Sequence, residues 1–300
     1  MKKYYSKEKI TIGVAAYGNL ENTKKCLDAI KNSIEGNFEI ILVDDCSPDN
    51  GEIKNYFINL KKDFKDIKVF YFSKNLGYVN SVNCILSSST GNKIIFVSND
   101  IFINPYYLEE VINISNISED VGYVRGVSNF VDTALELHNV DLKEYSNTNP
   151  INIAKDILLK NKNNYSEEEY LCGDCFLINR KLIDVIGYFD CRMFYQYFGD
   201  VDFGTRTRAF NFKSLVSKGA FCVHYRDSNF NYLPEKEKMD KINRRRYHLV
   251  EDWTRFKLKY NLPHNLPYTT INNINFNKLQ NQFNKNEKIR KIDYSEYLIL

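Results

Sequence analysis

The stretch NKIIFVSND, residues Asn92 to Asp100, places four consecutive apolar residues directly before a Ser-Asn-Asp sequence. An apolar run of this length predicts a buried β-strand, and the polar residues after it mark the end of that strand. Segments with helical period, such as ENTKKCLDAIKNSI and NPYYLEEVINIS, alternate with runs of this kind. The alternation predicts βαβ units and therefore an α/β fold. The other strand-like runs are Ile10–Ala16, Phe38–Val43, Ile67–Phe72 and Val121–Val127.

The predicted strands are continuously apolar, which is typical of a mostly parallel central sheet covered by helices on both faces. Right-handed crossovers bring the carboxyl ends of parallel strands to one edge, where ligands bind in open α/β sheets. Small, polar and acidic residues follow four of the strands. Such residues are also common in turns and helix caps, but their repetition indicates a site at this edge. The strand ends read AAYGN (15–19), VDDCSPDN (43–50), SKNLG (73–77) and SND (98–100).

Composition excludes several classes of protein. The 300 residues are 43% hydrophobic, enough for a large core, and the formal charge of +3 does not indicate a nucleic-acid binder. No apolar run approaches the ~18–20 residues that span a bilayer, and no signal sequence is evident, so we expect a cytoplasmic protein. The seven cysteines form no disulfide framework. We expect the Cys172 and Cys175 pair to be two buried thiols, although a redox or zinc role is the alternative.

Five motifs, taken in order, resemble those of the family 2 glycosyltransferases, which have the GT-A fold. They are ITIGVAAYGN, IILVDDCSPDNG, KNLGYVNSVN, IIFVSND and FGDVDFGTRTRAFNFK, and the resemblance extends from about residue 9 to about residue 226. It implies that the second Asp of VDD, Asp45, hydrogen-bonds the base of the donor nucleotide. It also implies that the donor nucleotide lies against Ala16, Tyr17, Asp45, Asn75, Gly77 and Asn99.

The resemblance implies a divalent cation, Mn²⁺ or Mg²⁺, on the donor diphosphate. Asp100 corresponds to the last acid of the family's metal-binding motif, and His224 lies where relatives often supply another ligand. A carboxylate can lie beside a diphosphate when a hard cation separates them. Ser98 and Asn99 replace the acids that often precede the last Asp, which leaves one formal charge in the motif. A purely structural role is the alternative for His224.

Asp200, in FGDVDF, corresponds to the family's catalytic base. An acceptor hydroxyl is a poor nucleophile until its proton is removed, and a single in-line displacement with inversion needs one base. Asp202 lies two positions later and points in another direction; it either faces the acceptor or pairs with Arg206 at i,i+4. The segment Tyr170–Asp190 resembles the family's acceptor-side segment. We therefore expect an acceptor pocket at Gly173 and Asp174, the alternative being a strand that turns into a capped helix.

These motifs together predict an inverting, metal-assisted glycosyltransferase that uses a nucleoside diphosphate sugar. The spacing in NLGYVNSVN is similar to that of members which build bacterial surface glycans, including rhamnosyltransferase-like ones. The expected acceptor is a polysaccharide, a lipid-linked glycan or a glycoprotein. A nucleotide-sugar-binding protein without catalysis is one alternative. A sugar nucleotidyltransferase is another, but AAYGN is not the glycine-rich loop that holds a triphosphate.

The chain is expected to comprise a catalytic domain, residues 1–230, and a helical C-terminal extension, residues 231–300. Residues 129–169 show little hydrophobic period and are interpreted as a long, partly mobile insertion that closes over bound donor. KINRRRYHLVEDWTRFKLKY is expected to form an amphipathic helix. Its Arg244–Arg246 run is either a solvated face or a contact for an anionic acceptor or lipid headgroups, so peripheral membrane contact is compatible with the sequence.

Overall fold

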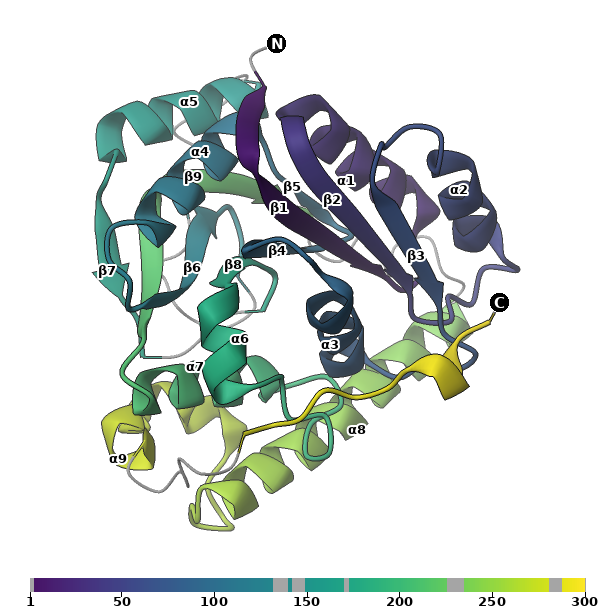
Figure 1. The fold of residues 1–300 in the computed structure, drawn as a ribbon. Coiled ribbons are helices and arrows are strands. Elements are labelled where there is room, and N and C mark those ends of the chain that lie inside the picture. The colour runs from purple at the N-terminus through teal and green to yellow at the C-terminus, as the bar shows by residue number, and fades with distance from the viewer. Residues whose placement is uncertain are drawn as a thin grey trace.

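The computed structural model describes residues 3–131, 140–141, 149–169, 173–225, 235–280 and 288–299. Its centre is a mixed β-sheet with strand order β3-β2-β1-β4-β8-β6-β9-β5, and β7 pairs with β9 (Figure 1). The strands are β1 (Tyr4–Ala16), β2 (Ile34–Asp44), β3 (Ile67–Tyr71), β4 (Lys93–Ser98), β5 (Ile101–Phe102), β6 (Val121–Ser128), β7 (Tyr165–Glu167), β8 (Cys175–Asn179) and β9 (Lys213–His224).

The first four predicted strands are confirmed as a parallel unit. β1 pairs in parallel with β2 and with β4, and β2 pairs in parallel with β3. The second half of the sheet is mixed, because β8 runs antiparallel to both β4 and β6. The carboxyl ends of β1 to β4 therefore share one edge with the amino end of β8.

Helices cover both faces of this sheet, as the continuous apolar strands predicted. Along β2, Ile40 and Leu42 pack into one cluster with α1, α2 and α4, whereas Ile41 and Val43 pack into a second cluster with α3, α6, α7 and α8. This alternation follows from the period of two in a strand. The helices are α1 (Leu20–Ser33), α2 (Glu52–Leu60), α3 (Tyr78–Ser88), α4 (Pro105–Ser115), α5 (Pro150–Asn161), α6 (Arg180–Ile186), α7 (Gly199–Ala209), α8 (Glu235–Lys259) and α9 (Phe276–Gln280).

The expectation for residues 129–169 was wrong for the part that the structure describes. α5 begins at an Asn149 cap and buries an apolar stripe against β9, with Ile153 and Ile157 packed near Val216 and Phe221. β7 then pairs antiparallel with β9. The positions i and i+4 of this stripe are a helical signal that the surrounding Asn and Lys residues obscured in the sequence. Residues 132–139 and 142–148 lie outside the described residues.

The C-terminal extension packs on the rest of the fold. α8 contains the predicted amphipathic helix, and its Trp253 and Phe256, with Tyr260 directly after it, are buried in the same cluster as α3 and α7. Residues 288–299 then cross α3 and reach the sheet through a bridge between Phe72 and Leu298. Two short 3-10 helices also belong to this extension, at Tyr268–Asn273 and Ser295–Tyr297. None of the helices in the described ranges is long and apolar enough to cross a membrane.

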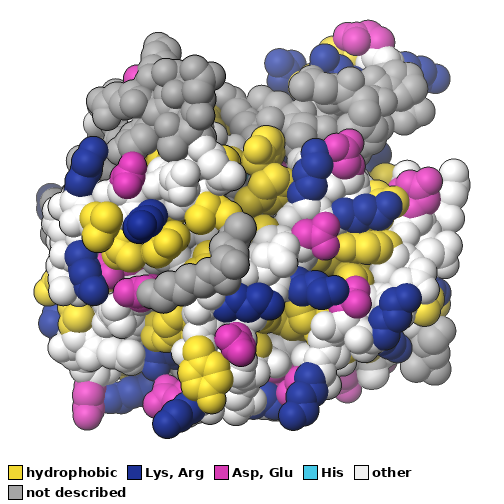
Figure 2. Space-filling model, turned by 90° about the horizontal axis from the view of Figure 1, so that it is seen from above, with side chains coloured by type: hydrophobic (Ala, Val, Ile, Leu, Met, Phe, Trp, Pro, Cys, Tyr) yellow, Lys and Arg dark blue, Asp and Glu magenta, His cyan; other side chains and the backbone are white. Residues whose placement is uncertain are grey.

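One face of the surface agrees with the small net charge. On the face above the amino end of β1, Lys and Arg side chains are interspersed with Asp and Glu side chains (Figure 2). Charges of one sign do not gather on this face, so it does not resemble a nucleic-acid-binding surface.

A buried ion pair fixes α7 within the fold. Arg206 donates to Asp202 at 2.9 Å and to the carbonyl oxygen of Ile186 at 3.1 Å, and both charged side chains are fully buried. Lys259 and Tyr260, at the end of α8, contact the other carboxylate oxygen of Asp202 at 2.6 and 2.8 Å. Asp202, buried with Arg206, therefore joins α7 to the end of α8 through ionic contacts in the protein interior.

Arg206→Met is expected to lower the free energy of unfolding by about 3–5 kcal/mol, because it keeps much of the side-chain volume but removes one partner of a buried ion pair. Urea unfolding measures the loss. Lys213→Met is the control, since Lys213 forms a 2.8 Å pair with Asp120 that is exposed to water. Equal, small losses in the two variants would contradict a structural role for the buried pair.

Candidate active site

The ends of β1, β2 and β4 meet as the sequence predicted. The backbone N–H of Asp45 donates to the carbonyl oxygen of Ala16 at 3.0 Å. Gly18, in the next turn, donates to the Ser47 hydroxyl at 2.9 Å. From β4, the amide nitrogen of Asn99 donates to the carbonyl oxygen of Gly18 at 3.0 Å. These bonds join three loops into one surface at the carboxyl edge.

Asp45 orders the loop between β3 and α3. Its carboxylate accepts backbone hydrogen bonds from Leu76 at 2.6 Å and from Gly77 at 2.9 Å. Gly77 has φ 84°, and a Cβ there would lie 2.5 Å from the carbonyl oxygen of Tyr195, so this position requires glycine. Burial raises the pKa of Asp45 to about 7, although these two hydrogen bonds oppose the shift. Asn75 donates to the Asp45 carbonyl oxygen at 3.2 Å, so three of the predicted donor-side residues form one unit.

Asn99 shapes the edge from within. It is buried, and its amide nitrogen also donates to the hydroxyl of Thr23 at 2.9 Å. Its contacts with Gly18 and Thr23 are to protein atoms of the β1–α1 turn and of α1. The structure thus gives Asn99 a supporting role beneath the expected donor surface.

Asp100 and His224 face each other across the pairing of β5 with β9. The Oδ2 of Asp100 lies 3.6 Å from the Nε2 of His224. The other ring nitrogen, Nδ1, lies 3.1 Å from the carbonyl oxygen of Phe130. Asn129 fixes the backbone of His224 with two hydrogen bonds of 2.8 and 3.0 Å. When His224 is neutral with its proton on Nδ1, donated to Phe130, Nε2 is the nitrogen that would ligate a metal ion on the side of Asp100.

Asp100 and His224 would be the side chains that hold a divalent cation, because a carboxylate oxygen and an imidazole nitrogen are both common metal ligands and these two lie 3.6 Å apart. Within the described ranges, no group of three or more His, Cys, Asp or Glu side chains is arranged to hold a metal. The two protein ligands would therefore need phosphate oxygens or water to complete the coordination.

Asp174 supports this pair from the amino end of β8. Its carboxylate lies 3.0 Å from Arg125 Nη2 and 3.6 Å from the Nδ1 of His224. Burial would lower the pKa of His224, but the hydrogen bond and charge of Asp100 and the charge of Asp174 raise it to about 9. Asp174 thus lies behind the histidine, held by a buried arginine. Sequence reasoning missed Arg125, although a charged residue inside the apolar run Val121–Val127 was a usable signal.

Asp200 lies in the first turn of α7, after a left-handed turn. Phe198, which is not glycine, has φ 59° and precedes Gly199. The Asp200 carboxylate accepts from the backbone N–H of Val201 at 2.9 Å. Loss of hydration raises the pKa of Asp200 to about 6, and the nearby charge of Asp174 adds to this rise. Hydrogen bonds from the backbone N–H groups of Val201, Asp200 and Gly173 oppose it. A carboxyl with this pKa can accept a proton near neutral pH.

Gly173 brings β8 close to Asp200. A Cβ at Gly173 would lie 2.2 Å from the Tyr78 hydroxyl and 3.0 Å from Asp200 Oδ2. Tyr78 itself donates to the carbonyl oxygen of Gly173 at 2.7 Å. Four side chains therefore follow one another in space along one edge, in the order Asp200, Asp174, His224 and Asp100. The charge of Asp174 acts on Asp200, and His224 lies 3.6 Å from both Asp174 and Asp100.

α8 holds the turn that presents Asp200. The buried carboxylate of Asp252 accepts backbone hydrogen bonds from Tyr195, Gln196 and Tyr197, at distances of 2.8 to 3.3 Å. The ring of Phe198 packs on Trp253 of the same helix, with centroids 5.1 Å apart. Strained backbone persists only where its surroundings fix it, and α8 supplies those contacts.

Asp202 does not belong to the acceptor side. It is fully buried, and its two oxygens contact Arg206, Lys259 and Tyr260. A carboxylate enclosed in this way cannot reach an acceptor, so the expectation that it lines the acceptor pocket is corrected. The alternative, an i,i+4 pair with Arg206, is confirmed.

A sequence model described as Glycosyl transferase family 2 matches residues 11–187, more than half of the chain. The chain belongs to glycosyl transferase family 2. Among curated proteins, this family 2 chain is similar to the glycosyltransferase GlyA of Streptococcus pneumoniae, with 36% identity over 105 residues. That match covers 34% of this chain and 14% of GlyA, so the chain corresponds to a small part of that relative's length.

Solved structures share the fold at low identity. The mannosyltransferase PcManGT from Pyrobaculum calidifontis, in complex with GDP-Man and Mn²⁺, has a TM-score of 0.58 at 15% identity, covering 92% of this chain and 70% of its own. GalNAc-T7, with UDP, GalNAc and Mn²⁺, has a TM-score of 0.57 at 11% identity, covering 92% and 54%. The fold of this family 2 chain is thus the predicted GT-A fold.

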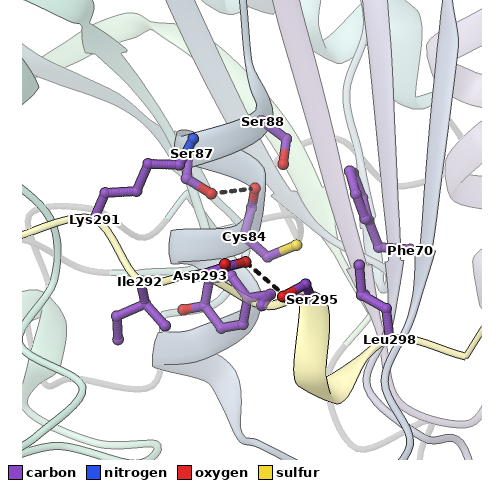
Figure 3. A pocket seen from close by; sticks show the side chains of 10 residues that line it. Phe70, Cys84, Ser87, Ser88, Lys291, Ile292, Asp293, Ser295 and Leu298 are labelled. Carbon is purple, nitrogen blue, oxygen red and sulfur yellow. Dashed lines mark hydrogen bonds between the residues drawn. The ribbon is translucent and has the colours of Figure 1, made fainter.

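A cavity of about 520 Å³ lies elsewhere, between β3, α3 and the C-terminal segment (Figure 3). Its lining includes Phe70, Cys84, Lys291 and Asp293 and none of the predicted site residues. Burial raises the pKa of Cys84 to about 12, so this thiol is not a nucleophile. Cys175 is a buried free thiol, as expected, whereas Cys172 lies outside the described residues. The cavity is therefore separate from the candidate site described above.

Asp200→Asn is expected to raise the free energy of unfolding by roughly 1–3 kcal/mol at pH about 7.5 and by nothing at pH about 3.5. Between pH about 4 and about 6, the folded protein keeps a proton on Asp200 that the unfolded protein has lost. Ionising Asp200 therefore costs the folded state free energy, and the fold loses stability as the pH rises through this range. Urea unfolding in EDTA across this range measures the difference.

Asp202→Asn is the matched control, and its change in the free energy of unfolding is expected to have the opposite sign. Although burial opposes it, the charges of Lys259 and Arg206 lower the pKa of Asp202, so its carboxylate stabilises the fold at neutral pH and this stability is lost on acidification. The Asp202→Asn variant should therefore lose stability at neutral pH. A pH-independent difference between Asp200→Asn and wild type would contradict the raised pKa.

Proposed function

We propose that the chain is an inverting, metal-assisted glycosyltransferase that moves a sugar from a nucleoside diphosphate sugar to an acceptor hydroxyl. The observation that carries the proposal is the succession of Asp200, Asp174, His224 and Asp100 along one edge. The carboxyl of Asp200 can accept a proton, and it lies near His224 and Asp100. That pair of side chains suits a cation bound to a diphosphate.

The donor is proposed to extend along the strand ends. Its base lies at Asp45, beside Tyr17, Asn75 and Gly77, and its diphosphate lies at Asp100. GDP-Man and UDP, the nucleotides in the two similar structures, support a nucleotide donor of this kind.

Asp200 is proposed as the general base. Its carboxylate accepts the proton of the acceptor hydroxyl while the hydroxyl oxygen attacks the anomeric carbon and the bond from that carbon to the diphosphate oxygen breaks. The electron pair of the broken bond leaves with the diphosphate, and the anomeric configuration inverts. Asp174 is engaged with Arg125, so Asp200 is the carboxylate placed for this proton transfer.

Asp100 and His224 would hold Mn²⁺ or Mg²⁺, which when bound offsets the charge that develops on the leaving diphosphate. Mn²⁺ is present in both similar structures. Arg125 and Asp174 keep His224 turned toward Asp100. The weak SND motif is thereby complemented by a histidine from β9.

The acceptor is proposed to be a surface polysaccharide, a lipid-linked glycan or a glycoprotein, approaching from the side of Gly173. A nucleotide-sugar-binding protein without catalysis would need no carboxyl of raised pKa at Asp200. Family membership also disfavours a sugar nucleotidyltransferase. For a lipid-linked acceptor, the proposal includes peripheral contact with the inner face of the cell membrane.

Removing divalent metal is expected to abolish nucleoside diphosphate release from nucleotide sugars, with recovery on adding Mn²⁺ or Mg²⁺. Asp100→Ala should not recover with metal and should lose Mn²⁺-dependent binding of the nucleoside diphosphate in calorimetry. Asp28→Ala is the control, because Asp28 is an exposed acid on α1. Full activity in chelator would mean that side chains alone stabilise the leaving group.

Asp200→Asn is expected to lower turnover at saturating donor by at least ~100-fold while leaving nucleotide affinity nearly unchanged, because a general base contributes typically ~10²–10⁴-fold. Wild-type turnover should fall as pH drops below about 6, where the base becomes protonated. Asp184→Asn, at an exposed position of α6, is the control. A stable Asp200→Asn variant with near-normal turnover would remove Asp200 from the mechanism.

A further inference from the structure

One face of α8 carries cationic and aromatic side chains toward the donor side. Lys241, Arg244, Arg245 and His248 have the spacing i, i+3, i+4 and i+7, which places them on one side of a helix. Arg246 falls on nearly the opposite side. Figure 1 shows α8 passing beneath α3 toward the end of the sheet where β1, β2 and β3 terminate.

Two residues of this face contact Tyr17, the residue that follows β1. Arg244 Nη1 donates to the Tyr17 hydroxyl at 3.4 Å, and Lys241 Nζ lies 5.8 Å from the centre of the Tyr17 ring. One turn further along, the His248 ring stacks on Tyr195, with centroids 4.3 Å apart. Tyr195 in turn donates to the side chain of Asn75. α8 therefore borders the donor side at two points.

The strand order fixes what these cations face. β1 lies between β2, which leads into Asp45, and β4, which leads into Asp100. A nucleotide with its base at Asp45 and its diphosphate at Asp100 must pass the end of β1, where Tyr17 lies. Lys241 and Arg244 thus border the middle of the bound molecule, where ribose joins phosphate.

Positive charge is concentrated at this point. Lys241 is half-buried, and burial together with the charges of Arg245 and Arg244 lowers its pKa to about 8. Neighbouring cations repel one another, and an anion bound among them relieves that repulsion. Charge complementarity therefore favours a phosphate beside this face.

We propose that Lys241 and Arg244 of α8 are donor-binding residues that contact the phosphate next to the ribose. The proposal rests on the proposed function and extends the donor site beyond the strand ends to the C-terminal extension. Arg245 strengthens the local positive potential, and the contact of His248 with Tyr195 positions α8. The Arg244–Tyr17 hydrogen bond holds the guanidinium at the edge before the nucleotide arrives.

The experiment compares nucleotide and nucleoside binding by calorimetry. UDP, GDP, CDP, ADP and dTDP are the phosphate-bearing probes, and the corresponding nucleosides are the probes without phosphate, each with Mn²⁺ and with EDTA. The variants are Arg244→Gln and the double variant Lys241→Ala with Arg244→Ala, and their folding is checked by thermal melting. Arg246→Ala is the matched control, since it removes the same charge from the other side of α8.

The double variant is expected to bind the diphosphate that wild type prefers about 10-fold or more weakly, in Mn²⁺ and in EDTA, with nucleoside affinity changed by less than about 3-fold. Arg244→Gln should show a smaller loss, and Arg246→Ala none. Unchanged or tighter diphosphate binding in the double variant would overturn the proposal, and tighter binding would mean that α8 covers the site. Equal losses for nucleoside and diphosphate would also overturn it. If folded wild type binds none of the nucleoside diphosphates UDP, GDP, CDP, ADP and dTDP, the proposed function fails, and this proposal fails with it.

Discussion

The carboxylate of Asp252 accepts hydrogen bonds from three consecutive backbone N–H groups, and the side of the molecule that holds the candidate site depends on this contact. Residues 195–197 have no regular secondary structure, so their N–H groups need an acceptor if they are to stay out of water. Asp252 supplies it from α8. The next residue, Phe198, can then hold its left-handed conformation against Trp253, and α7 begins with Asp200 pointing toward β8. Asp202 repeats the connection further along α7 through Lys259 and Tyr260.

Four carboxylates of the candidate site share one edge of the sheet, and their surroundings differ. Asp174 is paired with Arg125, and Asp100 faces His224. Asp45 and Asp200 accept backbone hydrogen bonds instead, and burial raises the pKa of each. A carboxyl of raised pKa can take up a proton near neutral pH, and Asp200 is therefore suited to the proposed role of base. The imidazole beside Asp100 suits that pair to the proposed cation.

The elements with local signals could be predicted from the sequence. The apolar runs predicted the strands, and the polar residues directly after them predicted the strand ends at Asp45 and Asp100. The position of α8 also followed from its period. What could not be predicted depends on contacts between distant segments: Asp252 reaches Tyr195 across 57 positions. Asp202 was ambiguous for the same reason, because its burial depends on Lys259. Arg125 is different, since a charge inside an apolar strand was visible and its partner was not.

The residues after the family match form part of the candidate site. The match ends at residue 187, yet Asp200, His224 and all of α8 lie after it. An α-helix rises about 1.5 Å per residue, so Lys241 and Asp252 are roughly 16 Å apart along one rigid rod. The end of α8 near Lys241 borders the proposed donor site, and the part near Asp252 holds the turn before Asp200. A shift of α8 would change both ends together, because a packed helix moves as a unit. Under the proposed function, α8 would therefore link donor binding mechanically to the placement of the base.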